Sequence, residues 1–131
     1  MEIADLEIFK HAELAREKAY APYSGFAVGA ALVAENGERF DGCNVENRSF
    51  GLTMCAERVA LGAAISRGKN KFQLLAIISD SAEPVVPCGA CRQVLAEFNP
   101  NLRIVSRNLQ GRATEFDLAT LLPLPQQGIL G

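Results

Sequence analysis

Apolar side chains follow two different spacings along this 131-residue chain, and the spacings predict where helices and strands lie. Near the N-terminus, apolar residues such as Ile3, Leu6 and Phe9 recur at roughly helical intervals with charged residues between them, which indicates a helix. Short apolar runs bounded by Gly, Pro and Asn indicate strands instead. Together these patterns predict helices at 4–20, 55–67, 88–98 and 117–122, and strands at 28–35, 38–44, 74–78, 102–105 and 114–116.

The order of these elements predicts the fold class. Asn36-Gly37, between the first two strands, is a strong hairpin signal because both residues tolerate positive φ. The run from Leu74 to Ile78 is continuously apolar, as in a central strand that is covered on both faces. Strands that alternate with helices predict an α/β fold in which a mixed sheet lies between helical layers. We expect residues 1–131 to form a single domain with one core.

Composition and charge argue against several classes of protein. Thirteen basic and fifteen acidic residues give a net charge of -2, and no basic cluster is present, so we expect no nucleic-acid partner. The apolar runs are too short to span a membrane and the N-terminus lacks a signal-peptide pattern, so we expect no membrane association and a cytoplasmic location. In that reducing compartment, the C-x-x-C pair among the four cysteines indicates metal or redox chemistry rather than disulfides.

Three of the cysteines and one carboxylate form the pattern that carries the most chemical information. Cys88 and Cys91 are separated by two residues, a spacing at which two thiolates can bind one tetrahedral metal ion. Cys55 supplies a third ligand, and three protein ligands leave the fourth position open, as in catalytic zinc sites. Glu57 follows Cys55 by two residues, so it can move the protons of a zinc-activated water without being a ligand.

Two other interpretations of the cysteines stay open at this point. A redox C-x-x-C would use Cys88 and Cys91 alone and would need neither Cys55 nor Glu57. A structural zinc site would recruit Cys43 as a fourth ligand, although Cys43 lies in a predicted strand, where a buried free thiol is common.

Cys55 and Cys88 both fall where a helix is predicted to begin. Free backbone N–H groups and the positive end of the helix dipole stabilise a thiolate at such a position. Three thiolates make the zinc centre negative and therefore a poor Lewis acid, so donors to the sulfurs should restore part of its electrophilicity. Arg58, directly after Glu57, is the candidate for such a donor.

Further residues around this pattern indicate a particular family of proteins. From about residue 20 to residue 123, the sequence resembles the cytidine deaminases, in particular the short homotetrameric kind whose zinc is held by cysteines alone. The resemblance implies a three-layer α/β/α sandwich with a mixed five-stranded sheet. It also implies one zinc per subunit between two helix N-termini, and a homotetramer with shared active sites. The residues that carry it are Phe26-Ala27-Val28-Gly29-Ala30-Ala31, Asn44-Val45-Glu46-Asn47, Cys55-Ala56-Glu57 and Pro87-Cys88-Gly89-Ala90-Cys91.

The resemblance further implies an activity and a role for each matching residue. Cytidine and 2′-deoxycytidine would be hydrolysed to uridine and 2′-deoxyuridine with release of ammonia, as in pyrimidine salvage. Glu57 would carry a proton from water to N3 of the pyrimidine and then protonate the leaving amino group. Asn44 and Glu46 would bind the ribose 3′-hydroxyl. Phe26 would line the nucleoside pocket, and the N–H of Ala56 would bind the pyrimidine carbonyl.

Three positions depart from the family pattern. The family often has Tyr where this chain has Phe50, and commonly a small residue where it has Arg48. Gln126 stands where the family usually has a Phe that stacks on the base in a neighbouring subunit, a contact worth about 1–3 kcal/mol. These departures keep open a deaminase that acts on a modified cytosine nucleoside or on blasticidin S.

Two alternatives of other kinds also stay open. The first is a small zinc-stabilised binding domain without catalysis. The second is a nucleic-acid-editing deaminase, which is weaker because those relatives usually have His at the position of Cys55 and because this chain lacks a basic surface.

Overall fold

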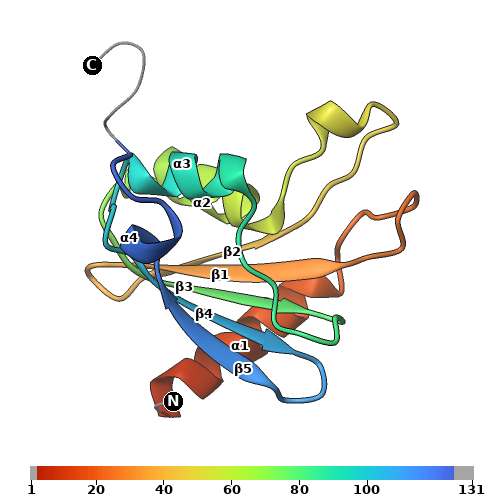
Figure 1. Ribbon diagram of the computed structural model, residues 1–131, viewed down its shortest axis with the longest axis horizontal. Coiled ribbons are helices and arrows are strands. Elements are labelled where there is room, and N and C mark those ends of the chain that lie inside the picture. The colour runs from red at the N-terminus through yellow and green to blue at the C-terminus, as the bar shows by residue number, and fades with distance from the viewer. Residues whose placement is uncertain (1–2, 126–131) are drawn as a thin grey trace.

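Five strands form one mixed sheet in the computed structural model, which describes residues 3–125. The strand order is β2-β1-β3-β4-β5 (Figure 1). β3 and β4 run parallel, and the other neighbouring pairs are antiparallel, so the prediction of a mixed sheet is confirmed. The strands are β1 (Val28–Ala34), β2 (Arg39–Cys43), β3 (Phe72–Ser79), β4 (Arg103–Asn108) and β5 (Ala113–Asp117).

Helices cover both faces of this sheet, which gives the three-layer α/β/α arrangement (Figure 1). One helix packs on one face, two pack on the other, and a short fourth helix lies next to β5. In this order they are α1 (Ile3–Arg16), α2 (Ala56–Ser66), α3 (Gly89–Ala96) and α4 (Leu118–Leu121). Within residues 3–125, none of the helices combines the length and apolar composition that a bilayer crossing requires.

The central strands are apolar throughout because each of their faces meets a helical layer. In β1, Leu32 contributes to the core beneath α2 and α3, whereas its neighbours Ala31 and Val33 contribute to the core beneath α1. In β3, Leu75 and Ile77 belong to the first of these cores, whereas Leu74, Ala76 and Ile78 belong to the second. Successive side chains of a strand point to opposite faces, so both cores depend on the same two strands.

The observed elements differ from the predicted ones in three places. α1 ends at Arg16 rather than near residue 20. β4 continues to Asn108, beyond its apolar stretch, because its polar end still pairs with β3. The loop after β2 contains a short 3₁₀ helix, η1 (Phe50–Leu52), that the apolar pattern does not predict.

Close packing of α2 on the sheet depends on the absence of a side chain at Gly42. A Cβ at this position of β2 would lie 2.5 Å from the Ala56 carbonyl oxygen and 2.5 Å from the Ala60 nitrogen. Such distances are too short for any non-bonded contact, so only glycine lets the first turn of α2 lie this close to β2. The position of that first turn matters because it carries two of the predicted site residues, Cys55 and Glu57.

Candidate metal centre and active site

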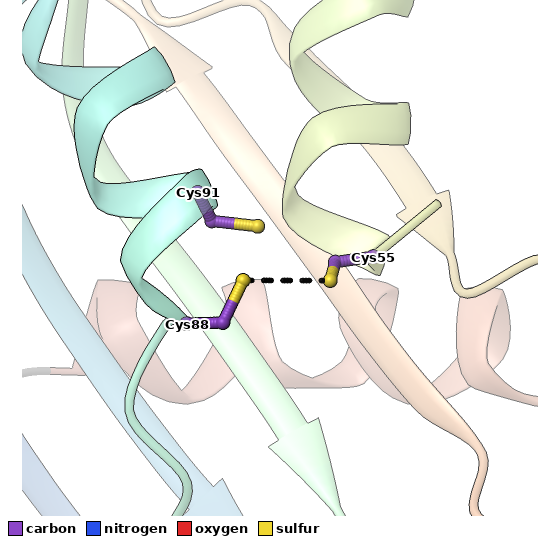
Figure 2. A group of neighbouring side chains, drawn as sticks. All are labelled: Cys55, Cys88 and Cys91. Carbon is purple, nitrogen blue, oxygen red and sulfur yellow. Dashed lines mark hydrogen bonds between the residues drawn. The ribbon is translucent and has the colours of Figure 1, made fainter. Parts of the chain in front are cut away.

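Three cysteines meet where α2 and α3 begin. Cys55 is the N-cap of α2, Cys88 is the N-cap of α3, and Cys91 lies in the first turn of α3. The Sγ atoms of Cys55 and Cys88 are 3.7 Å apart, and all three Sγ atoms lie within 4.8 Å of one another. Figure 2 shows the three side chains pointing toward a common centre between the two helices.

The spacing and chemistry of these sulfurs fit one zinc ion. A tetrahedral zinc with Zn–S bonds of about 2.3 Å holds its sulfurs about 3.8 Å apart, close to the distance between Cys55 and Cys88. All four cysteines of the chain are free, so these contacts are not disulfides. Thiolate sulfur is a soft ligand that suits zinc and not magnesium or calcium. The cluster therefore fits one zinc per chain.

Cys43 lies outside this cluster. The neighbouring residue Gly42 faces α2, and alternation along β2 turns Cys43 to the other face of the sheet. There Cys43 lines a separate groove beside α1, together with His11 and Lys18. Among residues 3–125, one group of side chains is close enough together to bind a metal ion, and it consists of three cysteines. The arrangement therefore does not support a structural four-cysteine site.

The thiols of the cluster influence one another strongly. A hydrogen bond with the Cys91 thiol lowers the pKa of Cys55 to about 5, and the Arg58 guanidinium adds to this effect. The same hydrogen bond, together with burial, raises the pKa of Cys91. The hydrogen bond thus favours the thiolate form of Cys55 and the thiol form of Cys91, and a metal cation that replaces the Cys91 proton is favoured.

Arg58 is placed against the cluster. Its Nη2 donates to the carbonyl oxygen of Thr53 at 3.2 Å and to Cys55 Sγ at 3.7 Å. The guanidinium therefore supplies a positive charge and an N–H donor to a sulfur, the position that the sequence predicts for it. A donor at this sulfur reduces the negative charge that the thiolates place on a metal.

An open cavity of about 270 Å³ lies next to the cysteines. This is close to the lower end of the roughly 300–1,000 Å³ that is usual for small-molecule sites. Most of the wall is apolar, and the polar groups are few. The lining residues are Phe26, Val28, Asn44, Thr53, Cys55, Ala56, Glu57, Val85, Val86 and Cys88.

Glu57 is the buried acid of this cavity, with 5% of the residue exposed. Burial raises the pKa of Glu57 to about 7, and the negative charge of Cys55 acts in the same direction. A carboxyl group whose pKa lies near neutral pH can both accept and donate a proton. Ala56, directly before it, is the first residue of α2, where a helix has N–H groups without a carbonyl partner in the preceding turn.

The remaining predicted substrate-binding residues lie in two different environments. Phe26 and Asn44 line the cavity beside Glu57. Glu46 is buried but is not part of the cavity wall, and its carboxylate binds the backbone of the loop at Tyr23 and Ser24. Gln126, the position of the expected family Phe, lies outside the described residues.

Sequence reasoning missed two parts of the site. Val85 and Val86 form part of the apolar wall of the cavity. From the sequence, their segment is predicted only as a polar connection that contains prolines. The one feature that could have indicated an apolar wall there is the pair of valines between two prolines. Ser24 is the second part. Nothing in the local sequence indicates that this loop serine binds Glu46, which lies 22 residues away in the sequence.

Comparison with known proteins places the chain in a family. The family model for the zinc-binding region of cytidine and deoxycytidylate deaminases matches residues 3–106. This match and the three-cysteine group between the two helix N-termini identify the protein as a zinc-binding deaminase. The chain belongs to the cytidine and deoxycytidylate deaminase family.

Individual relatives resemble the chain over most of its length. The cytidine deaminase of Sporosarcina psychrophila is 48% identical over 118 residues, which are 89% of this chain and 87% of the relative. A crystal structure of cytidine deaminase from Burkholderia pseudomallei matches with a TM-score of 0.88 at 46% identity, covering 95% of this chain and 98% of that one. The blasticidin-S deaminase of Bacillus cereus is more distant, at 30% identity over 130 residues, with 92% and 90% of the two chains covered.

Substitution of one cluster cysteine tests the metal site. We expect Cys91→Ser to lose most of its zinc, because a serine hydroxyl stays protonated at neutral pH and is a poor zinc ligand. Cys43→Ser is the matched control and should keep one zinc per chain. Metal content of the purified proteins, measured by mass spectrometry, checks both. Loss of zinc from the Cys43 variant with full retention in the Cys91 variant would contradict this assignment.

Proposed function

We propose that this protein is a zinc-dependent hydrolytic deaminase that converts cytidine and 2′-deoxycytidine to uridine and 2′-deoxyuridine. The observation that carries the proposal is the buried acid Glu57 in the same apolar cavity as the cysteine cluster. The names of the relatives from Sporosarcina psychrophila and Burkholderia pseudomallei support cytidine as the substrate. Such a reaction serves the salvage of pyrimidine nucleosides.

Cys55, Cys88 and Cys91 hold the zinc in this proposal. Zinc bound there would lower the pKa of a coordinated water to about 7, so that the water could attack at neutral pH. The three cysteine thiols would give up their protons to bind the cation as thiolates, and Arg58 would offset part of the negative charge through its contact with Cys55.

Glu57 moves the protons of the reaction. It takes a proton from the attacking water and delivers it to N3 of the pyrimidine, which makes C4 more electrophilic. The water oxygen adds to C4 as a hydroxyl, and Glu57 then takes the proton of this hydroxyl and passes it to the amino group at the same carbon. The C4–N bond breaks, ammonia leaves, and the water oxygen remains as the carbonyl oxygen of uridine. A pKa near neutrality suits a group that must accept and release a proton in each turnover.

The rest of the cavity binds and orients the nucleoside. Phe26 and the valines of the cavity wall bury the faces of the base. The N–H of Ala56 at the start of α2 binds the pyrimidine carbonyl. Asn44 and Glu46 bind the 3′-hydroxyl of the sugar, and analogues without that hydroxyl leave a hydrogen-bonding position of these buried polar groups unfilled.

Replacement of Glu57 by Gln tests the proposed proton transfer. We expect Glu57→Gln to keep one zinc per chain and to lower kcat for cytidine by roughly 100-fold or more, because the amide cannot accept and release the proton. Loss of the ultraviolet absorption of cytidine follows the reaction, and zinc content is measured on the same sample.

The same assay separates the related substrates. Wild-type protein that holds zinc, leaves cytidine and 2′-deoxycytidine intact and deaminates blasticidin S would contradict the proposed substrate. An unchanged rate on cytidine in the Glu57 variant would contradict the role of Glu57. A zinc-loaded wild type that deaminates none of these compounds would favour a binding domain without catalysis.

We also propose that four chains assemble and share their active sites. The loop after β2 projects from the body of the chain, with η1 near its outer end (Figure 1). Phe50 and Leu52 in η1 are 69% and 68% exposed, and Val45 and Met54 beside them are also exposed. Apolar side chains gathered on one exposed segment are typical of protein–protein contacts. The cavity is open on the single chain and borders Thr53 of this segment.

A charged side chain at this surface tests the assembly. We expect the wild type to behave as a particle of four chain masses in light scattering. Phe50→Asp should shift it to smaller species, because burial of an unpaired carboxylate in an apolar contact is costly. Ser66→Asp, which adds a carboxylate at an exposed polar position at the end of α2, is the control and should leave the mass unchanged. A monomeric wild type would contradict the proposal.

The proposal also covers the extent and location of the enzyme. We take residues 1–131 as one catalytic domain, supported by the family match and by relatives that cover most of the chain. The four free cysteines support a location in the reducing cytoplasm.

A further inference from the structure

The loop that carries Phe26 is fixed by side chains as well as by backbone pairing. At its start, Tyr20 forms an isolated bridge with Val45. At its end, both backbone groups of Phe26 bind side chains. The Phe26 N–H donates to Ser24 Oγ at 2.9 Å, and the Phe26 carbonyl accepts from Asn44 Nδ2 at 2.8 Å. The position of the Phe26 ring in the cavity wall therefore depends on Ser24 and Asn44.

Ser24 also binds the buried carboxylate of Glu46. Its hydroxyl donates to Glu46 Oε2, and its own N–H donates to Glu46 Oε1 at 3.1 Å. The N–H of Tyr23 donates to the same Oε1 at 3.0 Å. The Ser24 hydroxyl thus accepts from one residue and donates to the other, so it links Glu46 directly to the backbone of Phe26.

We propose that Ser24 is a positioning residue for the nucleoside, which holds the Glu46 carboxylate for the sugar hydroxyl and Phe26 for the base. This inference rests on the function proposed above, because it assigns Ser24 a role in that same site. Ser24 itself stays in the loop and acts through the two residues that it links.

The hydrogen-bond capacity of the linked groups leaves room for a substrate. A carboxylate offers about four acceptor positions, and Tyr23 and Ser24 occupy three on Glu46, so one remains for a sugar hydroxyl. Asn44 Oδ1 accepts from the Val28 N–H at 2.9 Å, and Nδ2 uses one of its two hydrogens on Phe26. Asn44 therefore also retains a donor and an acceptor position.

The charge state of Glu46 agrees with this arrangement. The Ser24 hydroxyl, together with the N–H groups of Ser24 and Tyr23, holds the pKa of Glu46 below its usual range and outweighs the opposing effect of burial. A charged carboxylate only accepts hydrogen bonds, so its remaining position selects for a hydroxyl donor. Loss of the Ser24 hydroxyl removes one of the three groups that set both the charge and the direction of this carboxylate.

Substrate selectivity of Ser24 variants tests the proposal. In Ser24→Ala we expect KM for cytidine to rise roughly tenfold with kcat changed by less than about threefold, as for loss of a binding interaction that contributes equally before and during the chemical step. The kcat/KM preference for cytidine over 2′,3′-dideoxycytidine should fall at least about fivefold, because the buried carboxylate no longer selects for the 3′-hydroxyl. Ser24→Thr retains the hydroxyl and should keep both values near those of the wild type.

Two controls separate positioning from general stability. Ser66→Ala removes the hydroxyl of an exposed serine at the far end of α2, roughly 15 Å along the helix from the cysteines, and should change neither value. Glu46→Gln should lose the same preference as Ser24→Ala, and the double variant should lose little more, because the two residues act through one contact.

The possible outcomes distinguish the role of Ser24 from the deaminase function itself. An active wild type whose Ser24→Ala variant keeps its KM and its preference would overturn the role of Ser24 and leave the deaminase function intact. Equal impairment in Ser24→Thr, or additive losses in the double variant, would also overturn it. A zinc-loaded wild type without activity on cytidine would refute the proposed function, and this inference with it. If Ser24→Ala does not fold, Ser24→Thr and Glu46→Gln still decide through the cytidine preference.

Discussion

The chemistry of this chain depends on one constraint, which is that α2 and α3 begin at the same place above the sheet. Cys55 and Cys88 cap these two helices, and their sulfurs can meet only because the caps lie side by side. The backbone builds this arrangement. Gly42 lets the first turn of α2 lie directly on β2, and α3 forms the crossover between the parallel strands β3 and β4.

The same constraint determines the electrostatics of the site. Two helix N-termini direct free N–H groups and partial positive charge toward the sulfurs, which favours thiolates. Cys91, in the first turn of α3, forms a hydrogen bond with Cys55 that lowers the pKa of Cys55 and raises that of Cys91, and a divalent cation that replaces the Cys91 proton relieves this opposition. Glu57 follows Cys55 into the first turn of α2, where burial keeps its pKa near neutrality. The start of α2 therefore places one metal ligand and the acid, and the start of α3 places the other two ligands.

Much of this site is predictable because it is local in sequence. The C-x-x-C spacing, the adjacent Glu57 and the helix starts at Cys55 and Cys88 can each be recognised within a few residues, and the structure brings all of them together. Cys43 is harder to assign, because only the alternation along β2 shows that it turns away from the cluster. The mixed sheet is also predictable, since its central strands are long apolar runs.

What the sequence does not predict depends on contacts between distant segments. The polar end of β4 is a strand because β3 lies beside it, and no local pattern indicates this. The carboxylate of Glu46 binds the loop at Tyr23 and Ser24 through hydrogen bonds that span more than twenty residues of sequence. The roles of the substrate-binding residues, Glu46 among them, stay predictions.

Zinc K-edge X-ray absorption on the purified protein without substrate tests the central claim most directly, because it counts the sulfur ligands of the metal. An open three-cysteine site predicts three sulfurs at about 2.3 Å and one oxygen at about 2.0–2.2 Å. Four sulfurs at the longer distance would contradict the account, because they would mean that Cys43 closes the site and leaves no position for the reacting water.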